Sequence, residues 1–70
     1  MTKFGLWLKH WRISACMSQE DLARRVGLSN QRISSFELGT KEPCLSTLKK
    51  LSVAMGVDFH EMIRTWEAES

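Results

Sequence analysis

Glycine residues divide this chain into segments that suit short α-helices and little else. Gly27, Gly39 and Gly56 each follow a short segment in which apolar side chains recur three or four positions apart. Glycine readily ends a helix because it adopts the left-handed conformation without strain. Val, Ile and Thr never alternate with polar residues over a run, so no strand is expected. The sequence therefore predicts an all-α fold.

Five helices are predicted, over roughly residues 3–14, 19–26, 30–38, 45–55 and 59–67. Residues that cap helix N-termini well precede four of them, and Ser18 and Asp58 each begin a capping-box pattern. The other two expected caps are Thr2 and Ser29. The side chains expected to face the core recur at helical spacing and are Phe4, Leu8, Trp11, Ala15, Leu22, Ala23, Val26, Ile33, Phe36, Leu45, Leu48, Leu51, Ala54, Met55, Phe59, Met62, Ile63 and Trp66.

The length of 70 residues suits one hydrophobic core, so we expect residues 1–70 to form a single domain. Cys16 and Cys44 form neither a disulfide framework nor a metal-binding pattern, which predicts reduced thiols, a cytoplasmic protein and no metal. No apolar run could cross a bilayer, so no membrane association is expected. Because no nucleophile–base pair or ligand cluster stands out, we expect no enzyme activity, no cofactor and no small-molecule ligand.

Charge is distributed unevenly along the chain. Residues 1–50 carry nine basic and four acidic side chains, a net charge of +5. Residues 51–70 carry one basic and four acidic side chains, a net charge of −3. A basic segment followed by an acidic one suits a protein that binds a polyanion on one side only. Ordinary solvated charge is the alternative explanation, and charge alone does not decide between them.

Residues 19–38 contain the most informative pattern. Two short helical segments flank the tripeptide Gly27-Leu28-Ser29. Gly27 can turn the chain, Leu28 can plug the core after the turn, and Ser29 can cap the next helix. Ala23 is small enough to let two helices approach closely. Together these residues predict a helix–turn–helix.

The sequence resembles the phage-repressor and Cro-type helix-turn-helix family, which is also called XRE-like. The resemblance rests on the stretch SQEDLARRVGLSNQRISSFELGTKEP, on Leu8 and Arg12 before it, and on LSTLKKLSVAMGVDFHEMI after it. The resemblance covers residues 4–63. It implies a five-helix domain whose second motif helix enters the major groove of double-stranded DNA. It also implies a sequence-specific transcriptional regulator.

Several kinds of small regulator fit this resemblance. They are restriction–modification controller proteins, which we favour, antitoxins, and phage Cro-like proteins. The rival from another class is a protein-interaction module that binds a partner protein, with DNA contact secondary. A recognition helix with a polar outer face favours DNA over such a partner.

The resemblance implies a set of DNA-binding positions. Asn and Gln side chains can bond bidentately to adenine, and Arg can do so to guanine. Without the family resemblance, a solvated helix face would explain the same polar residues. The implied phosphate-contacting and base-reading residues are Gln19, Ser29, Asn30, Gln31, Arg32, Ser35 and Lys41.

Other positions have structural roles or depart from the family pattern. Arg12 and Glu37 match a family ion pair that joins the first and third helices. Cys16 stands where the family often has Gly, and Cys44 where it often has a capping Ser; we interpret both as structural rather than redox-active.

Self-association is expected because an apolar stripe on the last helix exceeds what a small core needs. Ile63 and Trp66 are the expected interface residues of a homodimer, which would bind a near-palindromic operator. Leu6 and Trp7 occupy positions that the family usually fills with polar residues. They form either a second apolar patch or, for Trp7, a contact with the chain's own C-terminus.

Overall fold

Five α-helices make up the computed structural model, which describes residues 3–68. The helices are α1 (Lys3–Ser14), α2 (Gln19–Val26), α3 (Asn30–Leu38), α4 (Leu45–Met55) and α5 (Phe59–Glu67). Their bounds agree with the predicted ranges, and residues 3–68 contain no strand. The predicted all-α, five-helix fold is therefore confirmed. No helix in the described part of the chain is long and apolar enough to span a membrane.

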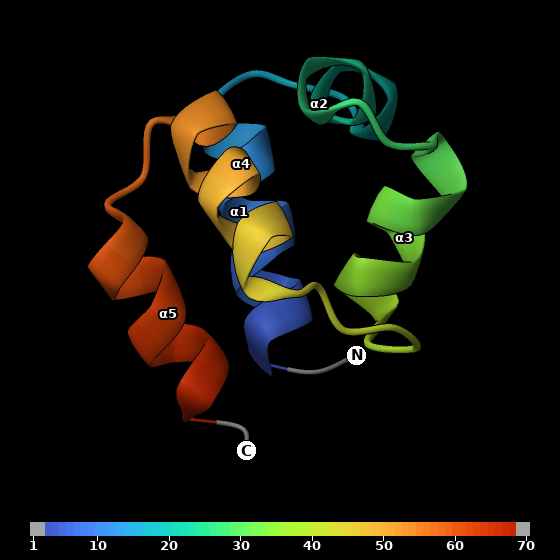
Figure 1. The fold of residues 1–70 in the computed structure, drawn as a ribbon. Coiled ribbons are helices and arrows are strands. Elements are labelled where there is room, and N and C mark those ends of the chain that lie inside the picture. The colour runs from blue at the N-terminus through green and yellow to red at the C-terminus, as the bar shows by residue number, and fades with distance from the viewer. Residues whose placement is uncertain (1–2, 69–70) are drawn as a thin grey trace.

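The helices surround one core, and α3 lies at its edge. α1 and α4 occupy the middle of the molecule, α5 lies along one side, and α3 lies along the other (Figure 1). α2 crosses the top of this view and contacts both α3 and α4. α3 packs mainly against α1 and α2, which leaves its outer side open.

The core receives a fully buried side chain from every helix. These side chains have no exposed surface or nearly none and are Leu8, Leu22, Ile33, Leu48, Leu51 and Met62. Prediction of Leu45 as a core residue was wrong, since its side chain is 61% exposed. Leu45 is the first residue of α4, where no neighbouring helix covers it. Five other expected core residues are only partly buried: Ala15, Ala54, Phe59, Ile63 and Trp66.

The helix ends follow the capping chemistry of the sequence. Ser18 Oγ accepts a hydrogen bond from the Asp21 N–H at 3.0 Å, and the Asp21 carboxylate accepts one from the Ser18 N–H at 3.1 Å. The bond from the Ser18 backbone is the main cause that lowers the pKa of Asp21. Asp58 caps α5 through the Glu61 N–H, but the reciprocal bond of a capping box is not formed there within residues 3–68. Thr2 lies outside the described residues.

Cys16 adopts a backbone conformation that usually belongs to glycine. Its φ angle is 58°, and it is the one residue other than glycine with a positive φ between residues 3 and 68. The Cys16 N–H donates to the Ile13 carbonyl at 2.9 Å, and the Met17 N–H donates to the Arg12 carbonyl at 3.1 Å. This pair of bonds is the Schellman motif that ends many helices. A side chain in the left-handed region is strained by its Cβ atom.

A buried ion pair joins α1 to α3. Arg12 Nε lies 2.7 Å from Glu37 Oε2, and both side chains are at least nine-tenths buried. The guanidinium also donates to the Met17 carbonyl at 2.8 Å. Gln19 Nε2 donates to Glu37 Oε1 at 3.1 Å, so the carboxylate accepts bonds from both α1 and α2. No buried side-chain N or O atom in the described chain lacks a partner.

Replacing Arg12 with Ala is expected to destabilise the domain by about 3–5 kcal/mol, because Glu37 would remain buried with its main cationic partner removed. Thermal unfolding monitored by circular dichroism measures the loss. The matched control is the double variant Arg12→Met with Glu37→Leu, which removes both charges and should recover most of the stability. An unchanged melting midpoint in Arg12→Ala would contradict a stabilising role for the pair.

Replacing Cys16 with Gly is expected to stabilise the domain by about 0.5–1 kcal/mol. The relief of left-handed strain, about 1–2 kcal/mol, exceeds the added backbone entropy of glycine in the unfolded chain. Chemical denaturation of wild type and variant measures the difference. Cys16→Ala is the control, since it removes the thiol but keeps the Cβ atom, and it should give no such gain.

Candidate nucleic-acid interface

A polar hollow on the open side of α3 gathers five of the seven predicted DNA-binding residues. The hollow has a volume of about 270 Å³ and is lined by Ser29, Gln31, Arg32, Ser35 and Lys41. No acidic side chain lines it, while Arg32 and Lys41 supply two cations. The hollow is therefore suited to an anionic or hydrogen-bonding surface.

The N-terminal turn of α3 presents its side chains to solvent. Ser29 Oγ accepts a hydrogen bond from the Arg32 N–H at 3.1 Å and thereby caps the helix. Asn30, Gln31 and Arg32 are all exposed, whereas Ile33 is fully buried. Because side chains along a helix repeat with its period, the buried side holds α3 in place and the opposite side stays free. The N-terminus also carries the positive end of the helix dipole.

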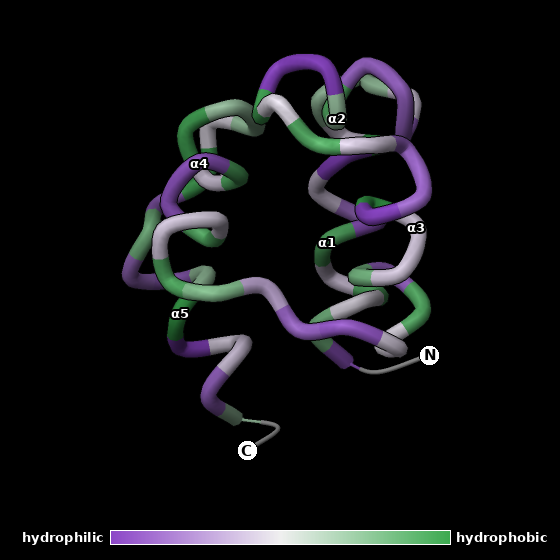
Figure 2. Tube along the Cα trace, turned by 45° about the vertical axis from the view of Figure 1, so that its right-hand side comes forward, coloured by the Kyte–Doolittle hydropathy of each residue, from purple (hydrophilic) through white to green (hydrophobic). Residues whose placement is uncertain are grey.

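The loop after α3 folds back and brings Lys41 to the hollow. The Ser35 carbonyl accepts bonds from the backbone N–H groups of Gly39, Thr40 and Lys41, at 3.0, 3.0 and 3.4 Å. Thr40 Oγ1 adds a bond of 3.3 Å to the same carbonyl. The tube in Figure 2 is hydrophilic along this loop. Lys41 is thus placed beside α3 by backbone geometry and not by sequence proximity alone.

Gln19 and Asn30 lie outside the lining of the hollow. Gln19 begins α2, is half-buried, and uses its amide N–H₂ group on Glu37. Its phosphate contact stays a prediction, and any such contact would have to coexist with the bond to Glu37. Asn30 is exposed at the first position of α3, next to the hollow but not part of its lining.

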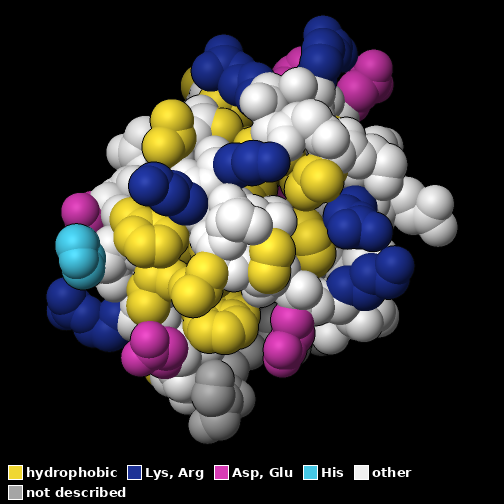
Figure 3. Space-filling view, viewed as in Figure 1, with side chains coloured by type: hydrophobic (Ala, Val, Ile, Leu, Met, Phe, Trp, Pro, Cys, Tyr) yellow, Lys and Arg dark blue, Asp and Glu magenta, His cyan; other side chains and the backbone are white. Residues whose placement is uncertain are grey.

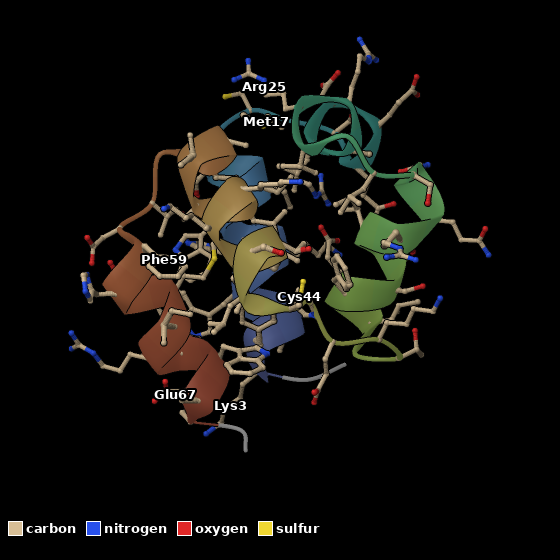
Figure 4. The ribbon with its side chains drawn as sticks, viewed as in Figure 1. Lys3, Met17, Arg25, Cys44, Phe59 and Glu67 are labelled. Carbon is tan, nitrogen blue, oxygen red and sulfur yellow. The ribbon has the colours of Figure 1, made fainter. Side chains whose placement is uncertain are left out.

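Cys44 is the N-cap residue of α4, but its side chain does not form the usual capping hydrogen bond with the backbone of the helix. Its Sγ atom lies 3.1 Å from Ser46 Oγ and 3.3 Å from Thr47 Oγ1. Hydrogen bonds from Ser46 and then Thr47 lower the pKa of Cys44 to about 6. In Figure 4 Cys44 lies where the α3–α4 loop enters α4. The thiol thus occupies the position of a capping Ser and contacts two neighbouring hydroxyl groups.

Sequence reasoning missed a second group of cations. A groove separate from the hollow on α3 is lined by four cations, which are Arg24 and Arg25 on α2 and Lys49 and Lys50 on α4. Only the charge of these residues could be predicted from the sequence, because residues from two helices come together only in the fold.

Comparison with known proteins identifies the family. The family model described as helix-turn-helix matches residues 8–62. That match covers more than half of the chain and spans α2, the turn at Gly27 and α3. The chain belongs to the helix-turn-helix family.

The relatives of this helix-turn-helix protein are regulators. The SPbeta prophage-derived HTH-type transcriptional regulator YonR of Bacillus subtilis is 36% identical over 66 residues, which are 94% of this chain and 61% of YonR. The chain thus spans less than two thirds of that relative. The restriction-modification controller protein C.AhdI from Aeromonas hydrophila has a TM-score of 0.81 and 32% identity, over 86% of this chain and 91% of that one.

A third similar structure contains DNA. It is SinR, the master regulator for biofilm formation, solved in complex with DNA. Its TM-score is 0.79 and its identity 26%, over 86% of this chain and 97% of SinR.

Proposed function

We propose that this protein is a transcriptional regulator that binds DNA in a sequence-specific manner, with α3 in the major groove. The observation that carries the proposal is the hollow on α3, where two cations and three polar side chains converge on the open side of a helix-turn-helix. The likeness to SinR, whose structure contains DNA, supports it. The activity proposed is binding and not catalysis.

The residues of α3 divide into two roles. Asn30 and Gln31 carry amides that match adenine, and Arg32 carries a fork that matches guanine. The Ser29 hydroxyl accepts a bond from Arg32 and donates none among residues 3–68, so we assign its hydrogen to a phosphate at the helix N-terminus, where an anion is favoured. Lys41 and Gln19 are the further proposed phosphate contacts, and Ser35 borders the base-reading side chains.

Replacing Gln31 with Ala is expected to weaken binding to the selected operator by about 1–3 kcal/mol and to leave random DNA nearly unaffected. Fluorescence anisotropy with both duplexes at one salt concentration measures this. Lys41→Ala is the matched comparison: as a phosphate contact it should weaken both duplexes alike and flatten the salt dependence. Equal losses on both duplexes in Gln31→Ala would make Gln31 a phosphate contact instead.

We also propose that the protein binds a near-palindromic operator as a homodimer through α5. A two-fold dimer that reads one face of DNA places its recognition helices about 34 Å apart. Ile63 and Trp66 are half-buried and pack against the core, so each keeps part of its surface for a partner. The competing patch is on α1, where Leu6 is 53% and Trp7 is 42% exposed. The Trp7 ring lies against the Trp11 ring of the same helix, with centroids 5.1 Å apart and the planes tilted by 53°.

Replacing Trp66 with Ala is expected to shift the protein from dimer to monomer and to weaken operator binding, because buried aromatic side chains dominate such interfaces. Sedimentation velocity at micromolar concentration measures the shift. Trp7→Ala is the control and should leave the dimer intact. A dimer lost in Trp7→Ala but kept in Trp66→Ala would move the interface to α1.

Among small regulators, the likeness to C.AhdI favours a controller protein of a restriction–modification system. That chain is covered almost completely, so the similarity extends over its whole fold. Genes for a nuclease and a methyltransferase beside this one would support the proposal, and a toxin gene would favour the antitoxin alternative.

A further inference from the structure

A cationic groove runs between α2 and α4, separate from the hollow on α3. We name it the α2–α4 groove. Its volume is about 1080 Å³, and it shares no lining residue with the hollow. Its lining contains no acidic residue and consists of Arg24, Arg25, Val26, Gly27, Ser46, Lys49, Lys50, Val53 and Ala54.

Positive charge stands on both walls of this groove. Arg25, Lys49 and Lys50 form no ion pair with any residue between 3 and 68, and all three are exposed. Arg24 meets the acidic residues of its own helix only at 3.4 and 3.8 Å, in contacts that are open to solvent. Such exposed pairs are weak. The groove therefore keeps most of its positive potential.

Apolar side chains line the same groove as the cations. Val53 is 75% exposed, and Ala54 beside it is partly exposed. Figure 3 shows Lys and Arg next to hydrophobic side chains in the upper part of the face that carries α4, and Asp and Glu at the lower edge of the hydrophobic group. Arg25 reaches from α2 towards the C-terminal end of α4 in Figure 4. A partner that fills this groove needs carboxylates for the cations and apolar side chains for Val53 and Ala54.

We propose that the α2–α4 groove binds an acidic amphipathic helix of a partner protein. Such a helix lays apolar side chains at helical spacing into a groove, here against Val53 and Ala54. Its flanking carboxylates meet Arg24 and Arg25 on one wall and the two lysines on the other. This surface goes beyond the proposed DNA recognition, since no residue that lines it was assigned to DNA.

Other polyanions fit the groove less well. A DNA duplex presents mainly charged phosphates on its outside, which match the cations of the groove but offer nothing apolar to Val53. A membrane surface is flat, whereas the cations stand along two sides of a groove, one formed by α2 and the other by α4. A peptide helix is narrow and offers both carboxylates and apolar side chains. It therefore fits the groove better than a duplex or a membrane does.

The test uses a fluorescein-labelled synthetic helix with Leu at every third or fourth position and Glu between them. A peptide of the same composition in scrambled order keeps the charge but loses the apolar stripe. The charge variant is Lys49→Glu with Lys50→Glu. Its control, Lys3→Glu with Lys9→Glu, makes the same change in charge on α1, and Lys3 lies at the opposite end of the molecule from Arg25 (Figure 4).

Fluorescence anisotropy should show that Lys49→Glu with Lys50→Glu weakens binding of the amphipathic peptide by about tenfold or more, and the α1 control by about twofold at most. Val53→Ser should weaken the amphipathic peptide but not the scrambled one. Gln31→Ala should leave peptide binding unchanged, which separates this surface from the DNA site. Circular dichroism establishes that each variant keeps the wild-type melting midpoint.

Four results of the peptide experiments would overturn the proposal. They are no binding of the peptide to the wild type, equal losses in the two lysine pairs, equal binding of the scrambled peptide, and an unaffected Val53→Ser variant. Random duplex DNA serves as the last probe. If the Lys49 and Lys50 variant loses far more affinity for it than the α1 control does, the groove is a phosphate-binding surface instead.

Discussion

The carboxylate of Glu37 is the point on which the arrangement of the helices depends. It is buried, and it accepts hydrogen bonds from Arg12 at 2.7 and 3.3 Å and from Gln19 at 3.1 Å. α1 and the start of α2 are thereby both tied to the C-terminal half of α3. A buried carboxylate is tolerated only with such partners. The geometric consequence is that the orientation of α3 is fixed from its inner side.

That constraint suits α3 to the recognition role proposed for it. Ile33, Phe36 and Glu37 face inward, so the contacts that hold the helix lie on one side. Gln31, Arg32 and Ser35 lie on the other side and take no part in the core. A helix held rigidly from behind can present polar groups without losing much entropy on binding. Stability and the proposed recognition thus use opposite sides of the same nine-residue helix.

Local chemistry made the helices predictable from sequence, and long-range packing made other features unpredictable. Ser18, Gly27 and Ser29 determine helix ends through bonds within a few residues, so the bounds could be predicted. The Arg12–Glu37 pair spans 25 positions and was expected only through the family resemblance. Leu45 was misplaced because periodicity does not show whether a neighbouring helix covers the first turn of α4.

The same limit applies to the two candidate surfaces. Residues 29–35 lie in one stretch, and their polar pattern could be recognised, although their DNA contacts stay a prediction. The α2–α4 groove joins side chains that are about 25 positions apart in the sequence, and no periodic pattern links them. The sequence shows the contribution of these cations to the net charge, whereas only the fold shows that they lie on neighbouring helices.

Charge and shape together orient the molecule towards a polyanion. α3 with its cationic hollow lies on one side, and α5 lies on the opposite side (Figure 1). The outward residues Asp58, Glu61 and Glu67 make the α5 end acidic. Phosphates attract the cationic parts of the molecule, which include the α2–α4 groove as well as the α3 side, and repel the acidic α5 end. The repulsion also keeps α5 away from DNA, which leaves that helix available for contact with a second copy of the chain.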